Sequence, residues 1–232
     1  RVFERFKEVV WQDGLQGSIL MKMRRYAKGI DLVVQKLYSL ALTGYPALKH
    51  IAIVAYGSYG RGYPGASSDV DLVVVLQEEK ELGRSEMLSG LDVLDEMFKE
   101  VFAQSRNKER KVWADQDTPE KLQEDLAPQA VKGLDLFAYR QYLNARFVAG
   151  NQRLYNRRVV PVFANALVSY QHPLIRQLIL ERDTLYTKNQ YHPLGIGIDL
   201  KAGLGGINEW NLIEQLATLD RPRWLRILPA WL

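Results

Sequence analysis

The sequence predicts an α/β (α+β) fold, with a small mixed-sheet module followed by an all-helical module. Two short apolar runs with strand character, Ile51–Ala55 and Val70–Leu76, lie in the first half of the chain among helical patterns. Beyond about residue 120, only helical patterns recur. The chain has 232 residues, of which 47% are hydrophobic, and this is ample material for packed cores.

The chain opens with a helical pattern that runs from about Val2 to Leu42. Apolar residues recur there at three- and four-residue spacing, and Gly44 and Pro46 end the pattern. The members of this apolar stripe are Ile30, Val33, Val34, Leu37 and Leu40. The predicted strands at residues 51–55 and 70–76 follow, so the sheet begins directly after this helical segment.

Three further elements are predicted before the end of the sheet module. Arg84–Phe102 has the apolar periodicity of an amphipathic helix. Lys111–Ala114 is a candidate for a short third strand. Pro119 suits the first position of a helix that Asp117 or Thr118 caps.

The second half of the chain is predicted to be helical, apart from one glycine-rich loop. The expected segments are helices over Leu134–Val148, Gln152–Ser169 and Pro173–Lys188, a loop over Tyr191–Gly206 and a helix over about Ile207–Leu219. The predicted domains are an N-terminal helical segment (1–45), a core that contains the sheet (46–120), a helical domain (121–220) and a tail (221–232). Because the chain begins at Arg1 rather than methionine and ends abruptly, we expect further domains in a longer parent protein.

Composition restricts the partners and the compartment. The net charge is 31 − 27 = +4, which suits a polyanionic substrate but is too small to predict a nucleic-acid partner. No apolar run approaches the roughly 20 residues of a membrane-spanning helix, so no membrane partner is expected. The absence of cysteine excludes disulfides and thiolate metal sites, and it favours a cytoplasmic location.

The most informative motif joins a glycine-rich turn to two carboxylates. The turn Gly57–Gly62 follows the first strand, and Asp69 and Asp71 stand at the start of the second. Side chains two residues apart on a strand share a face, so these carboxylates can bind the same divalent ions. A Gly-Ser turn before a helix presents backbone N–H groups and a hydroxyl to an anion. The combination predicts chemistry on a nucleoside triphosphate.

The segments Ala55–Gly62 (AYGSYGRG) and Ser68–Leu72 (SDVDL) resemble the signature of the nucleotidyltransferase superfamily typified by DNA polymerase beta. The amino-acid sequence of these two segments is similar to that of a narrower branch, the bacterial uridylyltransferases that modify the PII signalling protein and related nucleotidyltransferases. Two later segments, Asn144–Asn151 (NARFVAGN) and Lys201–Glu209 (KAGLGGINE), are similar to motifs of that branch. Arg146, within the first of them, is expected on a helix and in a structural salt bridge.

The resemblance implies two Mg²⁺ ions, with Mn²⁺ as an alternative, bound by Asp69 and Asp71. It also implies a third carboxylate from a later strand, as a metal ligand or general base. Asp115 is our choice because it follows the candidate strand at residues 111–114. Asp117, which would share its face, and Glu109 are the alternatives.

The phosphate side of the implied site uses the turn. Ser58, with the backbone of Gly57 and Tyr59, is expected to bind the β- and γ-phosphates. Arg61 is expected either to neutralise the leaving pyrophosphate or to be solvated at a helix start. Lys201 and the glycines after it are expected either to contact the nucleotide or to form a tight packing turn.

The predicted function is metal-dependent transfer of a nucleoside monophosphate from a nucleoside triphosphate, such as ATP or UTP, to an acceptor hydroxyl (an EC 2.7.7-type reaction). Pyrophosphate is the second product. The resemblance favours a regulatory protein as acceptor, and a small molecule or an RNA end is the alternative. A further alternative is a non-catalytic regulatory module that binds nucleotide.

Overall fold

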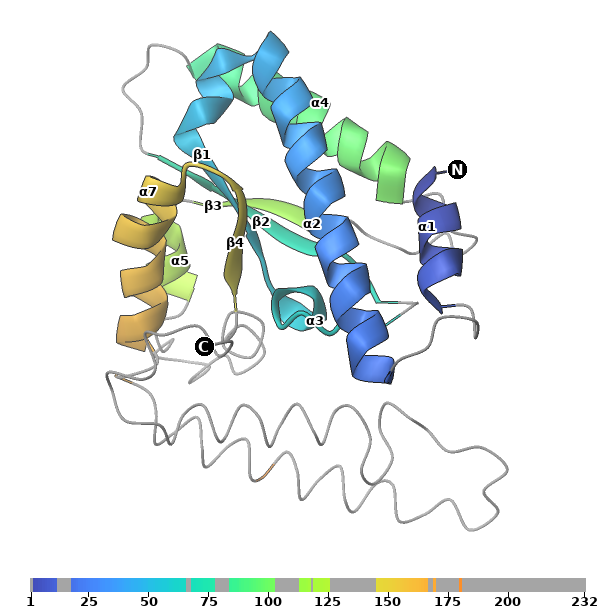
Figure 1. Ribbon diagram of the computed structural model, residues 1–232. Helices are drawn as coiled ribbons and strands as arrows, with labels where there is room; N and C mark the ends of the chain where they lie inside the picture. The colour runs from blue at the N-terminus through green and yellow to red at the C-terminus, as the bar shows by residue number, and fades with distance from the viewer. Residues whose placement is uncertain are drawn as a thin grey trace. The chain divides into compact units, whose positions relative to one another are not determined.

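The computed structural model describes residues 2–11, 18–65, 68–77, 84–102, 113–117, 119–125 and 145–166, together with residues 169 and 180 (Figure 1). The chain divides into two compact units. The first contains residues 1–125 and 137–162, and the second contains residues 126–136 and 163–232. The labelled helices and strands described below belong to the first unit.

The first unit is built on a mixed four-stranded sheet with the order β3-β2-β1-β4. The strands are β1 (Ile51–Ala55), β2 (Asp71–Leu76), β3 (Trp113–Asp117) and β4 (Arg146–Gly150). β1 pairs antiparallel with both β2 and β4, whereas β3 pairs parallel with β2. The predicted α/β class is therefore confirmed, and the turn between β1 and β2 connects two central strands.

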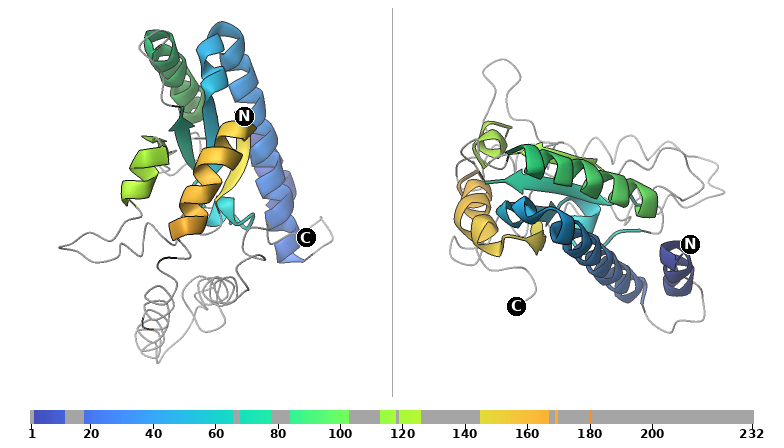
Figure 2. Two further views of the ribbon diagram at one scale, coloured as in Figure 1. Left: turned by 90° about the vertical axis from the view of Figure 1, so that its left-hand side faces the viewer. Right: turned by 90° about the horizontal axis from the view of Figure 1, so that it is seen from above.

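Two long helices cover one face of this sheet. They are α2 (Ile19–Gly44) and α4 (Arg84–Phe102), which lie side by side across the strands (Figures 1 and 2). The sheet residues in the core beneath these helices are Ile51, Ile53 and Ala55 from β1, Leu72 and Val74 from β2, and Val148 and Ala149 from β4. The alternate residues of the strands, Ala52, Val54, Val73 and Val75, are also fully buried. Because side chains alternate along a strand, Asp71 belongs with Val73 and Val75 on the second face.

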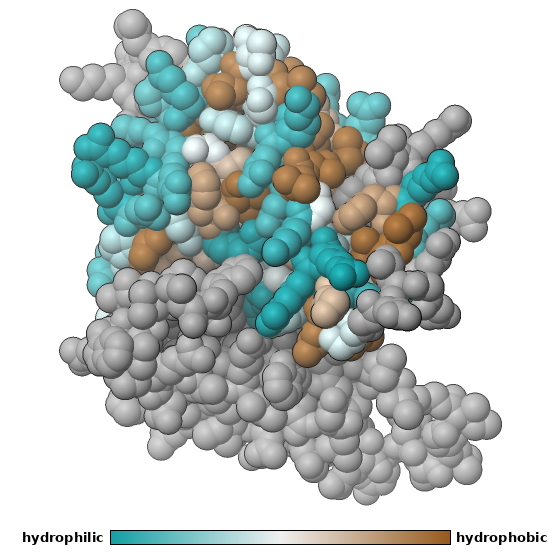
Figure 3. Space-filling model, in the orientation of Figure 1, coloured by the Kyte–Doolittle hydropathy of each residue, from teal (hydrophilic) through white to brown (hydrophobic). Residues whose placement is uncertain are grey.

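The helical segment at the N-terminus is confirmed as two helices, α1 (Val2–Trp11) and α2. Ser18 caps α2 by accepting a hydrogen bond from the N–H of Met21, which satisfies one of the otherwise unpaired donors of the first turn. Figure 3 shows separate apolar areas among hydrophilic ones on the face that carries α2. In the described ranges, no helix has both the length and the apolar character needed to cross a bilayer.

Sequence periodicity predicts α4 with its observed bounds, and α5 (Pro119–Asp125) begins at the expected proline. The third strand lies at residues 113–117, slightly later than the predicted 111–114, so Asp117 ends the strand. A short 3-10 helix (Pro46–His50) leads from α2 into β1. These elements position the turn after β1 and the start of β2 at one end of the sheet.

The prediction of a helix over residues 134–148 is wrong at its end, because residues 146–150 form β4. Hydrogen bonding to β1 overrides the local helical pattern there. Gly150 allows the close approach: its φ is +94°, and a Cβ atom would lie 2.3 Å from the carbonyl oxygen of Ile51. The predicted helix over Gln152–Ser169 is confirmed over the described residues. It contains α7 (Gln152–Leu154), a π-helical turn (Tyr155–Val159) and helical backbone to residue 166.

Several predictions fall outside the described residues. They are Glu109, Thr118, the helix over 134–144, most of the helix over 173–188, the loop over 191–206 with Lys201, the helix over 207–219 and the tail over 221–232. These stay predictions, as do the domain boundaries drawn from the sequence.

Candidate active site

The glycine-rich turn forms a single short helix, α3 (Gly57–Gly60), directly after β1. The N–H of Tyr56 donates to the carbonyl of Asp71 at 3.2 Å, so the pairing of β1 and β2 continues to the edge of the turn. The N–H groups of Gly60 and Arg61 donate to the carbonyls of Tyr56 and Gly57, which closes the turn. The first N–H groups of such a turn have no partner within it and point out of its N-terminal end.

Gly57 lies directly against the carboxylate of Asp71. Its φ is +61°, and a Cβ atom added there would lie 2.3 Å from Oδ2 of Asp71. Every other residue type carries that Cβ atom, and L-residues rarely adopt a positive φ. The contact requires glycine for both reasons. The glycine-rich turn and the carboxylate at the start of β2 therefore form one site.

The charge of Asp71 is held in an unfavourable environment. Burial, together with the negative charge of Asp69, raises the pKa of Asp71 to about 6, although the positive charge of Arg61 opposes the shift. Asp69 itself is exposed, just before β2. A divalent cation between the two carboxylates would remove this repulsion and favour their charged forms. The pair thus fits a Mg²⁺ or Mn²⁺ ion by its chemistry.

Asp115, the predicted third carboxylate, is placed by the register of its backbone in the sheet. In β3, the backbone of Trp113 pairs with Asp71 and that of Asp115 pairs with Val73. Asp115 therefore lies two register positions along the neighbouring strand from Asp71, and Asp117 lies two further on. Among the residues described here, no group of three histidine or acidic side chains forms a metal site. The role of Asp115 remains a prediction.

The side chains of the turn point in different directions. Ser58 is half-buried at the start of α3, next to Gly57. Tyr59 is fully buried, and its hydroxyl donates to Oδ1 of Asp31 at 2.6 Å. Burial and the charge of Asp31 raise the pKa of Tyr59 well above its ordinary value, so the hydroxyl stays protonated as a donor. Only the backbone of Tyr59 is therefore left for a nucleotide.

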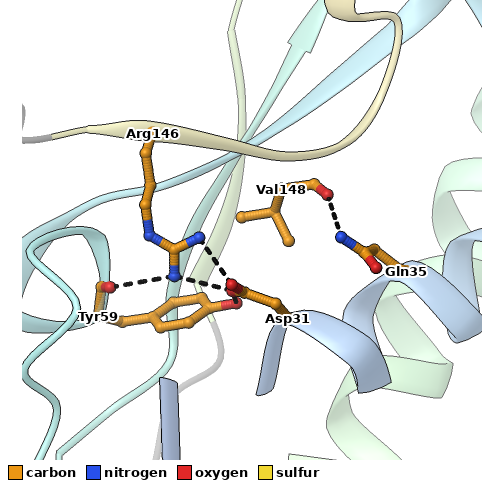
Figure 4. Close-up of polar contacts among 5 residues, drawn as sticks. All are labelled: Asp31, Gln35, Tyr59, Arg146 and Val148. Carbon is orange, nitrogen blue, oxygen red and sulfur yellow. Dashed lines mark hydrogen bonds and ion pairs between the residues drawn. The ribbon is translucent and has the colours of Figure 1, made fainter. Parts of the chain in front are cut away.

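Arg146 of β4 completes a partly buried polar cluster with Asp31 and Tyr59 (Figure 4). The Nη1 and Nη2 atoms of Arg146 donate to Oδ2 and Oδ1 of Asp31 at 2.9 and 2.8 Å. This confirms the predicted structural salt bridge, although Arg146 lies on a strand rather than a helix. The sequence reasoning missed Asp31, because a single acidic residue in an amphipathic helix has no distinguishing local pattern.

Comparison with known proteins adds one finding to this geometry. Residues 45–132 match the family model described as a nucleotidyltransferase domain. The matched segment contains β1, the turn, β2 with both aspartates, α4, β3 and α5. The match supports the nucleotidyltransferase superfamily, and hence the transfer of nucleoside monophosphates in general. No match was found among the curated proteins.

Proposed function

We propose that the protein is a metal-dependent nucleotidyltransferase that transfers a nucleoside monophosphate from a nucleoside triphosphate to a hydroxyl group. The observation that carries this proposal is the contact between Gly57 and the carboxylate of Asp71. It brings the turn that we propose to bind phosphate together with a candidate metal ligand, within the segment that matches the nucleotidyltransferase family. The chemistry of both halves is what nucleotidyl transfer requires.

Each residue of the site has a proposed role. Asp69 and Asp71, with Asp115 as the third carboxylate, hold two divalent ions. Such ions, when bound, neutralise phosphate charge and lower the pKa of a bound hydroxyl. In the reaction, the acceptor oxygen forms a bond to the α-phosphorus while the bond from that phosphorus to the bridging oxygen breaks. The acceptor proton passes to a carboxylate of the site, and pyrophosphate leaves.

The turn is proposed to bind the leaving group. The Ser58 hydroxyl and the backbone N–H groups at the start of α3 donate to the β- and γ-phosphates. Arg61 follows α3, and its positive charge acts on Asp71, so it lies close enough to the site to offset the charge of pyrophosphate. Lys201 is proposed as a further nucleotide contact. These groups bind and orient the triphosphate.

The acceptor is proposed to be a regulatory protein of the PII class, on the resemblance of residues 55–62 and 68–72 to the uridylyltransferase branch. The test is incubation with Mg²⁺ and each of four nucleoside triphosphates labelled at the α-phosphate, with PII protein or a cell lysate as acceptor. We expect label on a protein band and pyrophosphate in solution. Label transferred only to small molecules or RNA would support the alternative acceptors.

Two variants make the test specific. Asp69→Asn and Asp71→Asn should each abolish pyrophosphate release while leaving the fold intact. Asp92→Asn is the matched control, because Asp92 is an exposed carboxylate on α4. Undiminished release by Asp71→Asn would refute the assigned metal site.

A second candidate function is nucleotide binding without turnover. The sequence leaves this alternative open, because no later carboxylate stands out in it as the third metal ligand. Nucleotide binding by the wild-type protein without any pyrophosphate release would support it.

A further inference from the structure

The short helix α3 has two functional sides. Gly57 faces Asp71, whereas Tyr59 lies two residues later, about 200° around the helix axis. The Tyr59 ring therefore enters the core beside α2, away from the carboxylate, and its hydroxyl meets Asp31. The side of the turn that faces the candidate site and the side that anchors it are thus separate.

Arg146 contacts this anchor in two ways. Its guanidinium carbon lies 5.0 Å from the centre of the Tyr59 ring, within the range of a cation–π interaction. Its Nη2 also donates to the carbonyl oxygen of Tyr59 at 3.4 Å, a long hydrogen bond. Both carboxylate oxygens of Asp31 accept hydrogen bonds from the same guanidinium, and this bidentate ion pair fixes the orientation of the Arg146 side chain. Three elements, α2, α3 and β4, meet at these side chains (Figure 4).

The turn needs such an anchor because it has little stability of its own. A helix of four residues lies far below the length at which helices are stable in isolation. Two of its four residues are glycines, which lose more conformational freedom on ordering than any other residue. Tyr59 is its only side chain with extensive burial in the core. The conformation of the turn therefore depends on what holds Tyr59.

We infer that Asp31 and Arg146 are positioning residues, which act through Tyr59 to hold Gly57 and Ser58 in place against the nucleotide. The kinetic consequence of this inference rests on the proposed function, whereas its structural consequence does not. If the anchor is loosened, the turn opens more often, and a nucleotide meets a site that is formed for only part of the time.

The first experiment measures amide hydrogen exchange in two variants, each of which lacks one tyrosine hydroxyl. Tyr59→Phe keeps the ring over Arg146 but removes the donor to Asp31. Tyr38→Phe is the matched control, because the Tyr38 hydroxyl donates from α2 to the carbonyl of Leu48 at 3.1 Å, away from the turn. Loss of a hydrogen bond to a charged group should accelerate exchange of the Gly60 and Arg61 amides roughly tenfold or more in Tyr59→Phe. In Tyr38→Phe those amides should exchange at the wild-type rate.

The second experiment asks whether the anchor acts through the turn during turnover. We expect Tyr59→Phe to lower kcat/KM for the nucleoside triphosphate about tenfold, and Tyr38→Phe to change it less than about twofold. In a Ser58→Ala background, the further loss caused by Tyr59→Phe should shrink to less than about twofold, because the two residues act on one element. Arg146→Lys retains the positive charge but loses the bidentate pair with Asp31. Its kcat/KM should lie between those of the wild type and Tyr59→Phe.

The outcomes separate this inference from the proposed function. If the wild-type protein releases no pyrophosphate, the proposed function fails, and amide exchange still decides whether the network holds the turn. Equal exchange rates at Gly60 and Arg61 in Tyr59→Phe and Tyr38→Phe would overturn the inference. Fully additive kinetic effects of Tyr59→Phe and Ser58→Ala would overturn it as well, because the network would then act elsewhere in the protein.

Discussion

The substitution Gly57→Ala tests the site at its closest contact. The new Cβ atom would lie 2.3 Å from Oδ2 of Asp71, whereas real Cβ contacts are essentially never shorter than 3.0 Å. The two groups must therefore separate by at least 3.0 − 2.3 = 0.7 Å. The carboxylate or the turn has to move by that amount, since a methyl group cannot be compressed.

The expected magnitudes follow from this displacement and from the backbone. An alanine held at φ +61° destabilises the fold by about 1–2 kcal/mol, partly offset by the lower entropy of its unfolded chain. A misplacement approaching 1 Å within a reacting geometry lowers a rate by up to about a hundredfold. We therefore expect a loss of about 1 kcal/mol in unfolding free energy and a fall in kcat of roughly 30- to 100-fold.

The assay is Mg²⁺-dependent pyrophosphate release, with urea unfolding measured on the same preparations. Gly44→Ala is the matched control, because Gly44 ends α2 and a Cβ atom there meets nothing within 4 Å. It should leave kcat unchanged and stability equal or slightly higher. If Gly57→Ala retains activity within about threefold of wild type, the contact with Asp71 is not part of the catalytic site.

Three more outcomes are expected. Because the pKa of Asp71 is raised from 3.8 to about 6, the folded state binds this proton more tightly, so stability falls as pH rises from about 4 to 6. The predicted loss of unfolding free energy is at most about 3 kcal/mol, and Asp71→Asn should abolish it when urea unfolding is compared between about pH 4 and pH 8. If the unfolding free energies of both proteins depend on pH in the same way, the raised pKa of Asp71 is contradicted. Mg²⁺ should raise the Tm of the wild type at pH 8 but not that of Asp71→Asn, and its effect should shrink below pH 6 as protons compete; an equal rise in both proteins would exclude Asp71 as a ligand. Asp31→Asn should destabilise the fold by about 2 kcal/mol, since it leaves the largely buried Arg146 without its carboxylate. Asp95→Asn, which breaks an exposed pair with Lys99, should have a clearly smaller effect. Equal losses in the two variants would show that the Asp31 pair is no stronger than a surface pair.

The central part of the fold could be predicted from the sequence because its signals are local. Buried strands such as β1 and β2 are continuous apolar runs, and α4 has a regular apolar stripe between polar residues. The order of turn and aspartates along the chain also predicted that they would lie together, and Gly57 does contact Asp71. The metal and phosphate roles of these residues stay predictions.

The errors and omissions concern contacts between distant parts of the chain. β4 is a strand because it pairs with β1, about 100 residues earlier, and its five residues do not indicate this alone. Asp31 is important because Arg146 and Tyr59 reach it, from 115 and 28 residues away. Neither partner can be identified from the residues around Asp31. A single sequence therefore indicates the elements of the site but not the side chains that support them.

The position of β4 has a consequence for how the domain can be divided. Residues 45–132 match the nucleotidyltransferase family, yet this segment contains neither α2 nor β4. Produced alone, it would expose β1 as an unpaired edge strand whose residues are otherwise fully buried, and such edges promote aggregation. During synthesis, the turn also lacks the inferred support of Arg146 until β4 has been synthesised. The proposed nucleotide site should therefore form late, after the matched segment has already been made.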